Sequence, residues 1–212
     1  MIPDDVTLTE DGLAPSDKGQ ILLLACGALA REIIAVKDAN GWDHMTLACL
    51  PAIYHNTPDK IVPAVREAVA KHRDAYAQIF VVYADCGTGG QLQAACAELG
   101  VQMVEGPHCY SFFEGNAAFE AKGELTAFYL TDFLVRQFDA FVTKPLGLDR
   151  DPKQAAILRD MYFGHYTKLV YQAQTDDPAL QAKAKTCAEK LGLDYEYRFT
   201  GYGDLATSLA RL

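Results

Sequence analysis

The chain has 212 residues, of which 50% are hydrophobic and 22% charged, and its formal net charge is −9 at pH 7. These proportions are ordinary for a packed globular protein. The excess of acid argues against nonspecific binding to nucleic acid or to an anionic membrane. The N-terminus lacks the basic and apolar segments of a signal peptide, and no apolar run approaches the roughly 20 residues that span a bilayer. We therefore expect a cytoplasmic protein without a nucleic-acid or membrane partner.

The first half of the chain alternates apolar strands with amphipathic helices, after a polar N-terminal arm at 1–18. Such alternation predicts a parallel sheet with right-handed crossovers. The near-continuous apolar runs agree, because parallel strands are buried on both faces. The expected strands are 20–25, 45–50, 79–84 and 101–105, and the expected helices are 28–38, 58–72 and 89–99.

The middle of the chain, about 110–165, is rich in aromatic residues and has helical spacing. We expect a helical insertion there, with most of its aromatic side chains in a core. The alternation then resumes, with expected strands at 167–173 and 195–199 and expected helices at 178–191 and 203–212. The predicted fold is a single α/β domain over 19–212, with a mostly parallel, Rossmann-like sheet of about six strands.

Three of the six cysteines follow the predicted ends of strands: Cys26, Cys86 and Cys109. The carboxyl ends of parallel strands share one edge of a sheet, so these thiols are expected to converge. In a reducing compartment, cysteines serve metal or catalytic roles more often than disulfides. Cys96 and Cys187 lie in alanine-rich helical patterns and are expected in the core. Cys49 lies within a strand and is an intermediate case.

Three thiolates favour zinc or an iron–sulfur cluster and leave a fourth position open for a small-molecule substrate. We expect a [4Fe–4S]-type cluster, with zinc as the alternative cofactor. A reactive thiol without metal, a redox pair and simple packing remain open. The spacing of the cysteines matches no short metal-binding motif, so the prediction rests on topology alone.

Polar and glycine residues near the cysteines complete the predicted site. His55, His108 and Asp85 are candidate acid–base residues, and either histidine is also a candidate fourth ligand. Glycines allow unusual backbone angles and close approach of a bulky group. The turn after Cys86 also permits an anion at the following helix N-terminus, although it matches neither common phosphate-loop pattern. The residues expected around the cofactor are Gly27, Gly87, Thr88, Gly89, Gly90 and Tyr110.

Several short motifs resemble the uncharacterised family catalogued as domain of unknown function 1638. They include Ala25-Cys26-Gly27, Tyr83-Ala84-Asp85-Cys86-Gly87-Thr88-Gly89-Gly90, Gly106-Pro107-His108-Cys109-Tyr110 and Tyr129-Leu130-Thr131-Asp132. The resemblance extends from about residue 20 to the end. It implies genes that often stand beside those of corrinoid methyltransferases for methylated amines, and hence a link to one-carbon metabolism. It supplies no catalytic residue.

Two functions follow as expectations. The first is a metalloprotein that holds its metal through Cys26, Cys86 and Cys109 and binds a small substrate, with enzymatic activity left open. The second is a module that delivers a metal, a corrinoid or a methyl group to a corrinoid protein or methyltransferase, without catalysis of its own.

Overall fold

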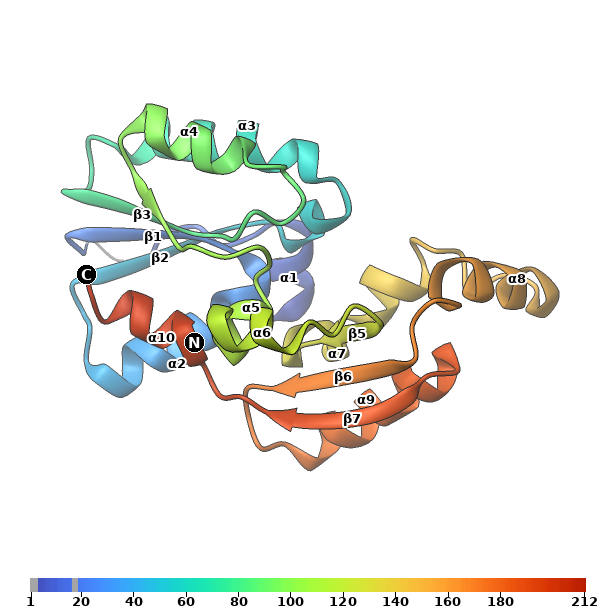
Figure 1. The fold of residues 1–212 in the computed structure, drawn as a ribbon. Helices are drawn as coiled ribbons and strands as arrows, with labels where there is room; N and C mark the ends of the chain where they lie inside the picture. Colours follow the sequence, from blue (N-terminus) through green and yellow to red (C-terminus); the bar gives the residue numbers. More distant parts are fainter. Residues whose placement is uncertain (1–3, 17–18) are drawn as a thin grey trace. The chain divides into compact units, whose positions relative to one another are not determined.

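The computed structural model describes residues 4–16 and 19–212, which divide into two compact units. The first unit comprises residues up to Phe112 together with Asp204–Leu212, and the second spans Phe113–Gly203. Each unit contains its own parallel sheet (Figure 1). None of the helices in the described ranges is both long and apolar enough to cross a membrane.

The first unit is built on a four-stranded parallel sheet of order β2-β1-β3-β4. Its strands are β1 (Ile21–Cys26), β2 (Met45–Leu50), β3 (Gln78–Val82) and β4 (Gln102–Met103). The central strands consist of apolar residues that are almost fully buried, including Leu22, Leu24 and Val81. In Figure 1, α3 and α4 lie on one face of the sheet and α2 and α10 on the other. This two-sided cover explains why the strands are continuously apolar.

The helices of this unit, apart from α1, lie within about three residues of the ranges expected from the sequence. They are α1 (Asp5–Glu10), α2 (Ala30–Asn40), α3 (Ile61–His72), α4 (Gln91–Leu99) and α10 (Gly203–Leu209), with short 3₁₀ turns at Gly27–Leu29, Ala52–Asn56 and Pro58–Lys60. Gly41 and Gly100 end α2 and α4 in the left-handed conformation, which glycine adopts without a steric penalty. The expected N-terminal arm instead contains α1, which Leu8 anchors because its side chain is fully buried.

The second unit has a three-stranded parallel sheet of order β5-β6-β7. Its strands are β5 (Ala127–Leu130), β6 (Lys168–Ala173) and β7 (Asp194–Phe199). Its helices are α5 (Ser111–Glu114, which straddles the boundary), α6 (Asn116–Lys122), α7 (Asp132–Arg136), α8 (Pro152–Phe163) and α9 (Pro178–Leu191), with a π-helical turn at Asp139–Thr143. The Asp177 carboxylate caps α9 by accepting from the N–H groups of Ala179 and Leu180, as its sequence predicts.

The expectation of one six-stranded sheet is wrong. The α/β class and the parallel pairing are confirmed, but the described residues form seven strands in two sheets. The missed strand is β5, which lies within the segment that we expected to be a helical insertion. It is only four residues long and leads directly into α7, so its aromatic residues merge with a helical pattern. Because β5 pairs with β6 rather than with β4, the second sheet is separate.

Candidate functional site

The three strand-end cysteines lie together in the first unit. Cys26 is the last residue of β1, whereas Cys86 and Cys109 lie in the loops that follow β3 and β4. The Sγ atoms of Cys86 and Cys109 are 3.1 Å apart. Cys26 is close enough that its charge and that of Cys86 both raise the pKa of Cys109. The structure therefore brings Cys86 and Cys109 into contact, and Cys26 lies within electrostatic range of them.

Backbone hydrogen bonds tie the two cysteine loops to each other. The Asp85 N–H donates to the Gly106 carbonyl at 3.1 Å, and the Cys86 N–H donates to the Pro107 carbonyl at 3.3 Å. These bonds continue the pairing of β3 with β4 past the last strand residues. They position Cys86 next to Cys109 although the two are distant in sequence.

The loop after β3 holds Cys86 in an unusual conformation. Cys86 has φ +49°, and it is the one non-glycine residue with positive φ among those described. Gly87, Gly89 and Gly90 also have positive φ. A β-carbon at Gly89 or Gly90 would meet no atom within 4 Å, so glycine is needed there for conformation rather than for space. A strained non-glycine residue between strand and helix is typical of functional sites.

Asp85 and Thr88 hold this loop in place. The Asp85 carboxylate accepts hydrogen bonds from the Gly90 N–H at 2.6 Å, the Gly89 N–H at 3.1 Å and the Thr88 hydroxyl at 2.9 Å. The bond from Gly90 is the main cause that lowers the pKa of Asp85. The Thr88 hydroxyl also accepts from the N–H of Leu92 in α4. Both side chains, expected to serve chemistry or a cofactor, are thus engaged in shaping the loop.

The thiols differ in how readily they ionise. A hydrogen bond from the Cys109 thiol lowers the pKa of Cys86, and the same bond raises the pKa of Cys109, which keeps its proton. Burial raises the pKa of Cys26 to about 12. Cys86 is therefore the most readily ionised of the three thiols, and the hydrogen bond from Cys109 favours its thiolate form.

Tyr83 completes the site, although the sequence analysis assigned it no role. It follows β3 directly and is 2% exposed, and its hydroxyl, which meets no oxygen or nitrogen partner among the described residues, lies near enough to the Cys26 thiol for each group to shift the pKa of the other. Burial raises its pKa, and Cys26, Cys109 and Cys86 raise it further, so the phenol lies near all three thiols. Its position at the end of a buried strand, three residues before Cys86, was the available signal. A thiol is a weak hydrogen-bond partner, so this buried hydroxyl would gain from a stronger acceptor.

The two candidate histidines lie within electrostatic range of each other. His55 is at the surface, yet crowding by protein atoms lowers its pKa, and repulsion from His108 lowers it further. Desolvation also lowers the pKa of His108, against the opposing effect of Asp85. The His108 ring stacks on Tyr110 with centroids 4.9 Å apart. Both imidazoles are therefore neutral near pH 7 and able to accept a proton or bind a metal.

The remaining cysteines and Gly27 have structural surroundings. Cys49, Cys96 and Cys187 are buried, as expected for the last two. Gly27, which we expected near a cofactor, packs closely against α1, where a β-carbon would collide with the carbonyl of Leu8. Within 4–16 and 19–212, no three His, Cys, Asp or Glu side chains stand ready-made as a metal-holding group.

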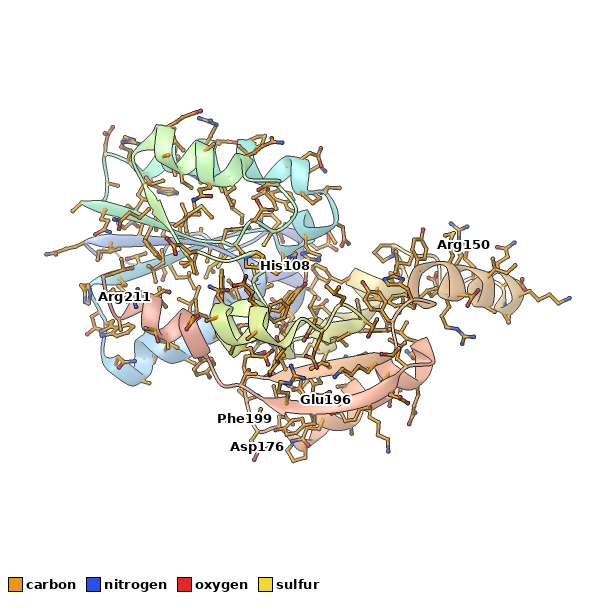
Figure 2. All side chains as sticks on the ribbon, viewed as in Figure 1. His108, Arg150, Asp176, Glu196, Phe199 and Arg211 are labelled. Atoms are coloured by element: carbon orange, nitrogen blue, oxygen red, sulfur yellow. The ribbon has the colours of Figure 1, made fainter. Side chains whose placement is uncertain are left out.

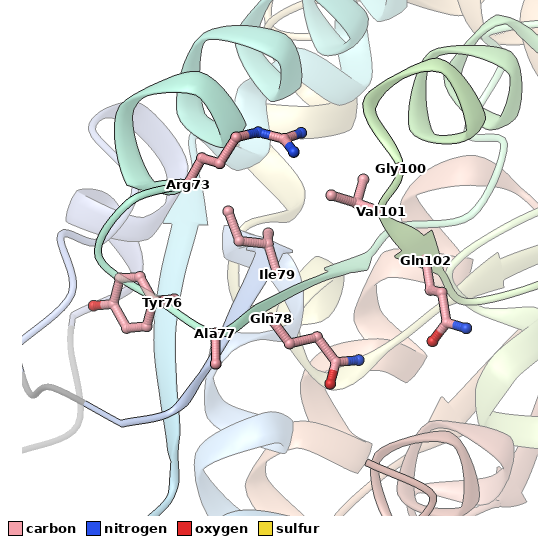
Figure 3. A pocket seen from close by; sticks show the side chains of 8 residues that line it. All are labelled: Arg73, Tyr76, Ala77, Gln78, Ile79, Gly100, Val101 and Gln102. Atoms are coloured by element: carbon pink, nitrogen blue, oxygen red, sulfur yellow. The ribbon is translucent and has the colours of Figure 1, made fainter.

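Two pockets occur in the first unit, at opposite ends of its strands. One, of about 200 Å³, is lined by Asp85 and Gly106 from the cysteine loops and by Gln93, Met103, Val104 and Glu105. The other, of about 340 Å³, surrounds the amino ends of β3 and β4. Figure 3 shows Gln78, Gln102 and Arg73 at this second pocket. The smaller pocket is the one that shares residues with the cysteine loops.

Comparison with known proteins gives one match. A family model described as "Protein of unknown function (DUF1638)" matches residues 49–209. No curated protein matches the chain, and no solved structure does. The matched region includes Cys86 and Cys109 and begins after Cys26, so it is shorter at its start than the resemblance in sequence motifs.

Proposed function

The chain belongs to the family described as protein of unknown function DUF1638, and from that premise we propose that it binds a thiophilic metal through Cys86, Cys109 and Cys26. The contact of 3.1 Å between the sulfurs of Cys86 and Cys109 carries the proposal. Cys26 supplies a third thiol nearby, and the buried Tyr83 hydroxyl supplies a donor beside it. Soft thiolate ligands select zinc and iron–sulfur centres over magnesium or calcium.

The spacing of the sulfurs favours a single ion over a cluster. Two thiolates on one tetrahedral zinc, each at about 2.3 Å, are about 3.8 Å apart. The Cys86 and Cys109 sulfurs are within an ångström of that value. In a [4Fe–4S] cluster each cysteine binds a different iron, which requires wider spacing. Zinc, the alternative in the sequence analysis, is therefore the form that we propose first.

The chain's own residues have distinct tasks in this proposal. Cys86 is the thiolate that binds first, and binding requires Cys109 and Cys26 to lose their protons. Tyr83 would donate its hydroxyl hydrogen to a bound thiolate, which satisfies its buried oxygen. Neutral His55 or His108 is available to accept the released proton or to fill the fourth position.

A reversible disulfide between Cys86 and Cys109 is the second candidate. The same 3.1 Å separation favours it, because a disulfide needs an approach of only about 1 Å, to 2.05 Å. Oxidation would remove two protons and two electrons from the pair, and an external thiol–disulfide partner would accept the electrons. For the site with its ligand bound, we also propose a delivery role, in which the protein passes a metal, a corrinoid or a methyl group to a corrinoid methyltransferase.

Element analysis of protein purified without oxygen tests the proposal. We expect about one equivalent of zinc, or iron with sulfide if the site holds a cluster, in wild-type protein. Cys86→Ser should abolish it. Cys96→Ser is the matched control, because Cys96 is buried in α4 of the same unit and should leave the metal in place. A metal-free wild-type protein whose Cys86 and Cys109 oxidise to a disulfide supports the second candidate instead.

A further inference from the structure

Strand β7 forms an exposed edge of the second sheet. It is the last strand in the order β5-β6-β7, and none of its six residues is buried. In β5, the other edge strand, three of four residues are buried. Figure 1 shows β7 beside β6. An exposed edge strand of this length offers unpaired backbone groups to another strand.

The backbone groups that face outward are those of the odd-numbered residues. The N–H groups of Asp194 and Thr200 donate inward to Thr167 and Ala173, which sets the alternation along the strand. Tyr195, Tyr197 and Phe199 therefore turn their N–H and C=O groups away from β6. In the described chain, no backbone hydrogen bond uses these outward groups. The strand also contains no proline, which would protect such an edge.

The side chains of these residues are aromatic rings, of which those of Tyr197 and Phe199 are exposed and that of Tyr195 is half-buried. Tyr197 is 38% exposed and Phe199 is 59% exposed. Tyr197 continues an aromatic row across the sheet, since its ring lies 5.9 Å from that of Tyr171. Figure 2 shows Glu196 and Phe199 on this strand. Exposed aromatic side chains beside unpaired backbone groups favour association with another strand.

We propose that β7 pairs with β7 of a second copy of this chain, antiparallel and centred on Tyr197. The sequence Asp194-Tyr195-Glu196-Tyr197-Arg198-Phe199 is complementary to itself in this register. Tyr197 lies opposite its own copy and Tyr195 opposite Phe199. Glu196 lies opposite Arg198, and because these two already form ion pairs within the chain, the partner's charges would extend an existing network. Opposite charges and aromatic pairs facing each other across strands stabilise a sheet.

The neighbouring registers are worse. A register shifted by one residue in total would no longer align the outward backbone groups of the two strands. Moving the centre of the pair by one residue on both strands keeps these groups aligned but places like charges opposite each other. A centre on Glu196 sets Glu196 against Glu196, and a centre on Arg198 sets Arg198 against Arg198. Like charges directly opposite each other destabilise a sheet. The register centred on Tyr197 therefore joins the two three-stranded sheets into a continuous one.

Cysteine cross-linking of the full chain tests both the partner and the register. In the proposed pair the two Tyr197 Cα atoms are about 5.5 Å apart, within the range of a disulfide. Tyr197→Cys should therefore give a disulfide-linked dimer under mild oxidation with diamide. The matched variant is Phe199→Cys, whose two copies would be about 14 Å apart and should not cross-link. Wild-type protein controls for the native cysteines.

Light scattering after size exclusion gives the second readout. We expect wild-type protein at twice the chain mass of 23.2 kDa. Tyr197→Lys should convert it to monomer, because two lysines would oppose each other at the centre, while circular dichroism stays unchanged. A monomeric wild-type protein, a dimer that Tyr197→Lys leaves intact, or equal cross-linking of the two cysteine variants would each overturn the proposal.

Discussion

The sulfur of Cys86 lies 3.1 Å from the sulfur of Cys109, across a separation of 23 residues along the chain. Two backbone hydrogen bonds between the loops after β3 and β4 set this contact. In this contact the Cys109 thiol donates a hydrogen bond to the sulfur of Cys86. This hydrogen bond affects the reactivity of Cys86.

Replacing Cys109 by alanine should raise the pKa of the Cys86 thiol, because the Cys109 hydrogen bond is the main cause that lowers it. At pH 7 the thiolate fraction falls, so alkylation of Cys86 by iodoacetamide should slow severalfold. Peptide mapping by mass spectrometry gives the rate at this residue. Cys187→Ala, in the buried face of α9, is the control and should leave the rate unchanged. An equal rate in Cys109→Ala and wild-type protein would contradict the pairing.

Removing the Tyr83 hydroxyl should lower the metal affinity without lowering the stability of the metal-free protein. Tyr83→Phe eliminates a buried hydroxyl whose neighbours are thiols, which are weak hydrogen-bond partners, so the metal-free protein should be as stable as wild type or more stable by about 1 kcal/mol. Metal affinity should fall, on the order of tenfold, because a bound thiolate loses its donor. Urea unfolding of metal-free protein and competition with a chelator measure the two effects. A less stable variant with unchanged affinity would show that the hydroxyl serves the fold.

The second unit contains an ion network whose pH dependence follows from Glu124. Its hydrogen bond from Arg198 is the main cause that lowers the pKa of Glu124 from 4.5 to about 2. The carboxylate also accepts from Lys168 at 2.6 Å. A lowered pKa means that the pair stabilises the folded state fully above about pH 4.5 and loses this effect as pH falls toward 2.

Glu124→Gln should therefore reduce stability at pH 7 and flatten the loss of stability between about pH 4.5 and 2. Urea unfolding at a series of pH values measures both. Glu98→Gln is the control, because Glu98 is exposed beside Arg66 and contributes at most about 0.5 kcal/mol. A pH profile for Glu124→Gln parallel to that of wild type would contradict the assignment.

Asp132 should be the most costly polar residue to remove from the second unit. It is 1% exposed and accepts hydrogen bonds from the Tyr171 hydroxyl, the Gln174 N–H, and the N–H and hydroxyl of Thr175. Asp132→Ala leaves these donors without an acceptor, so we expect a loss of about 3–5 kcal/mol. Thermal unfolding checks this value. A loss below about 1 kcal/mol would indicate that water replaces the carboxylate.

Much of this structure can be predicted because local sequence features indicate its strands and the ends of its helices. Apolar runs set β1, β2 and β6, and Gly41, Gly100 and Gly192 end their helices as their positions indicate. The strand β5 was missed, since its four residues carry no alternation that separates them from the helix that follows. Which strands pair cannot be read from local pattern, so one sheet was expected where there are two.

The candidate site was predictable at the level of topology, which placed Cys26, Cys86 and Cys109 at one edge. The roles of its polar residues were not. Asp85 anchors its own loop through bonds to Gly89 and Gly90, which depend on backbone angles that only the folded loop defines. Tyr83 belongs to an apolar run, and the position of its hydroxyl beside the thiols becomes visible only in the folded chain.

Titration of the reduced, metal-free protein with cobalt(II) tests the central claim most directly, because thiolate-to-cobalt charge-transfer absorption grows with the number of bound sulfurs. We predict saturation at one equivalent in wild type and Cys96→Ser, with intensity reduced in each of Cys26→Ser, Cys86→Ser and Cys109→Ser. An absence of this absorption in wild-type protein, or an undiminished band in all three variants, would contradict the claim that these cysteines form a metal site.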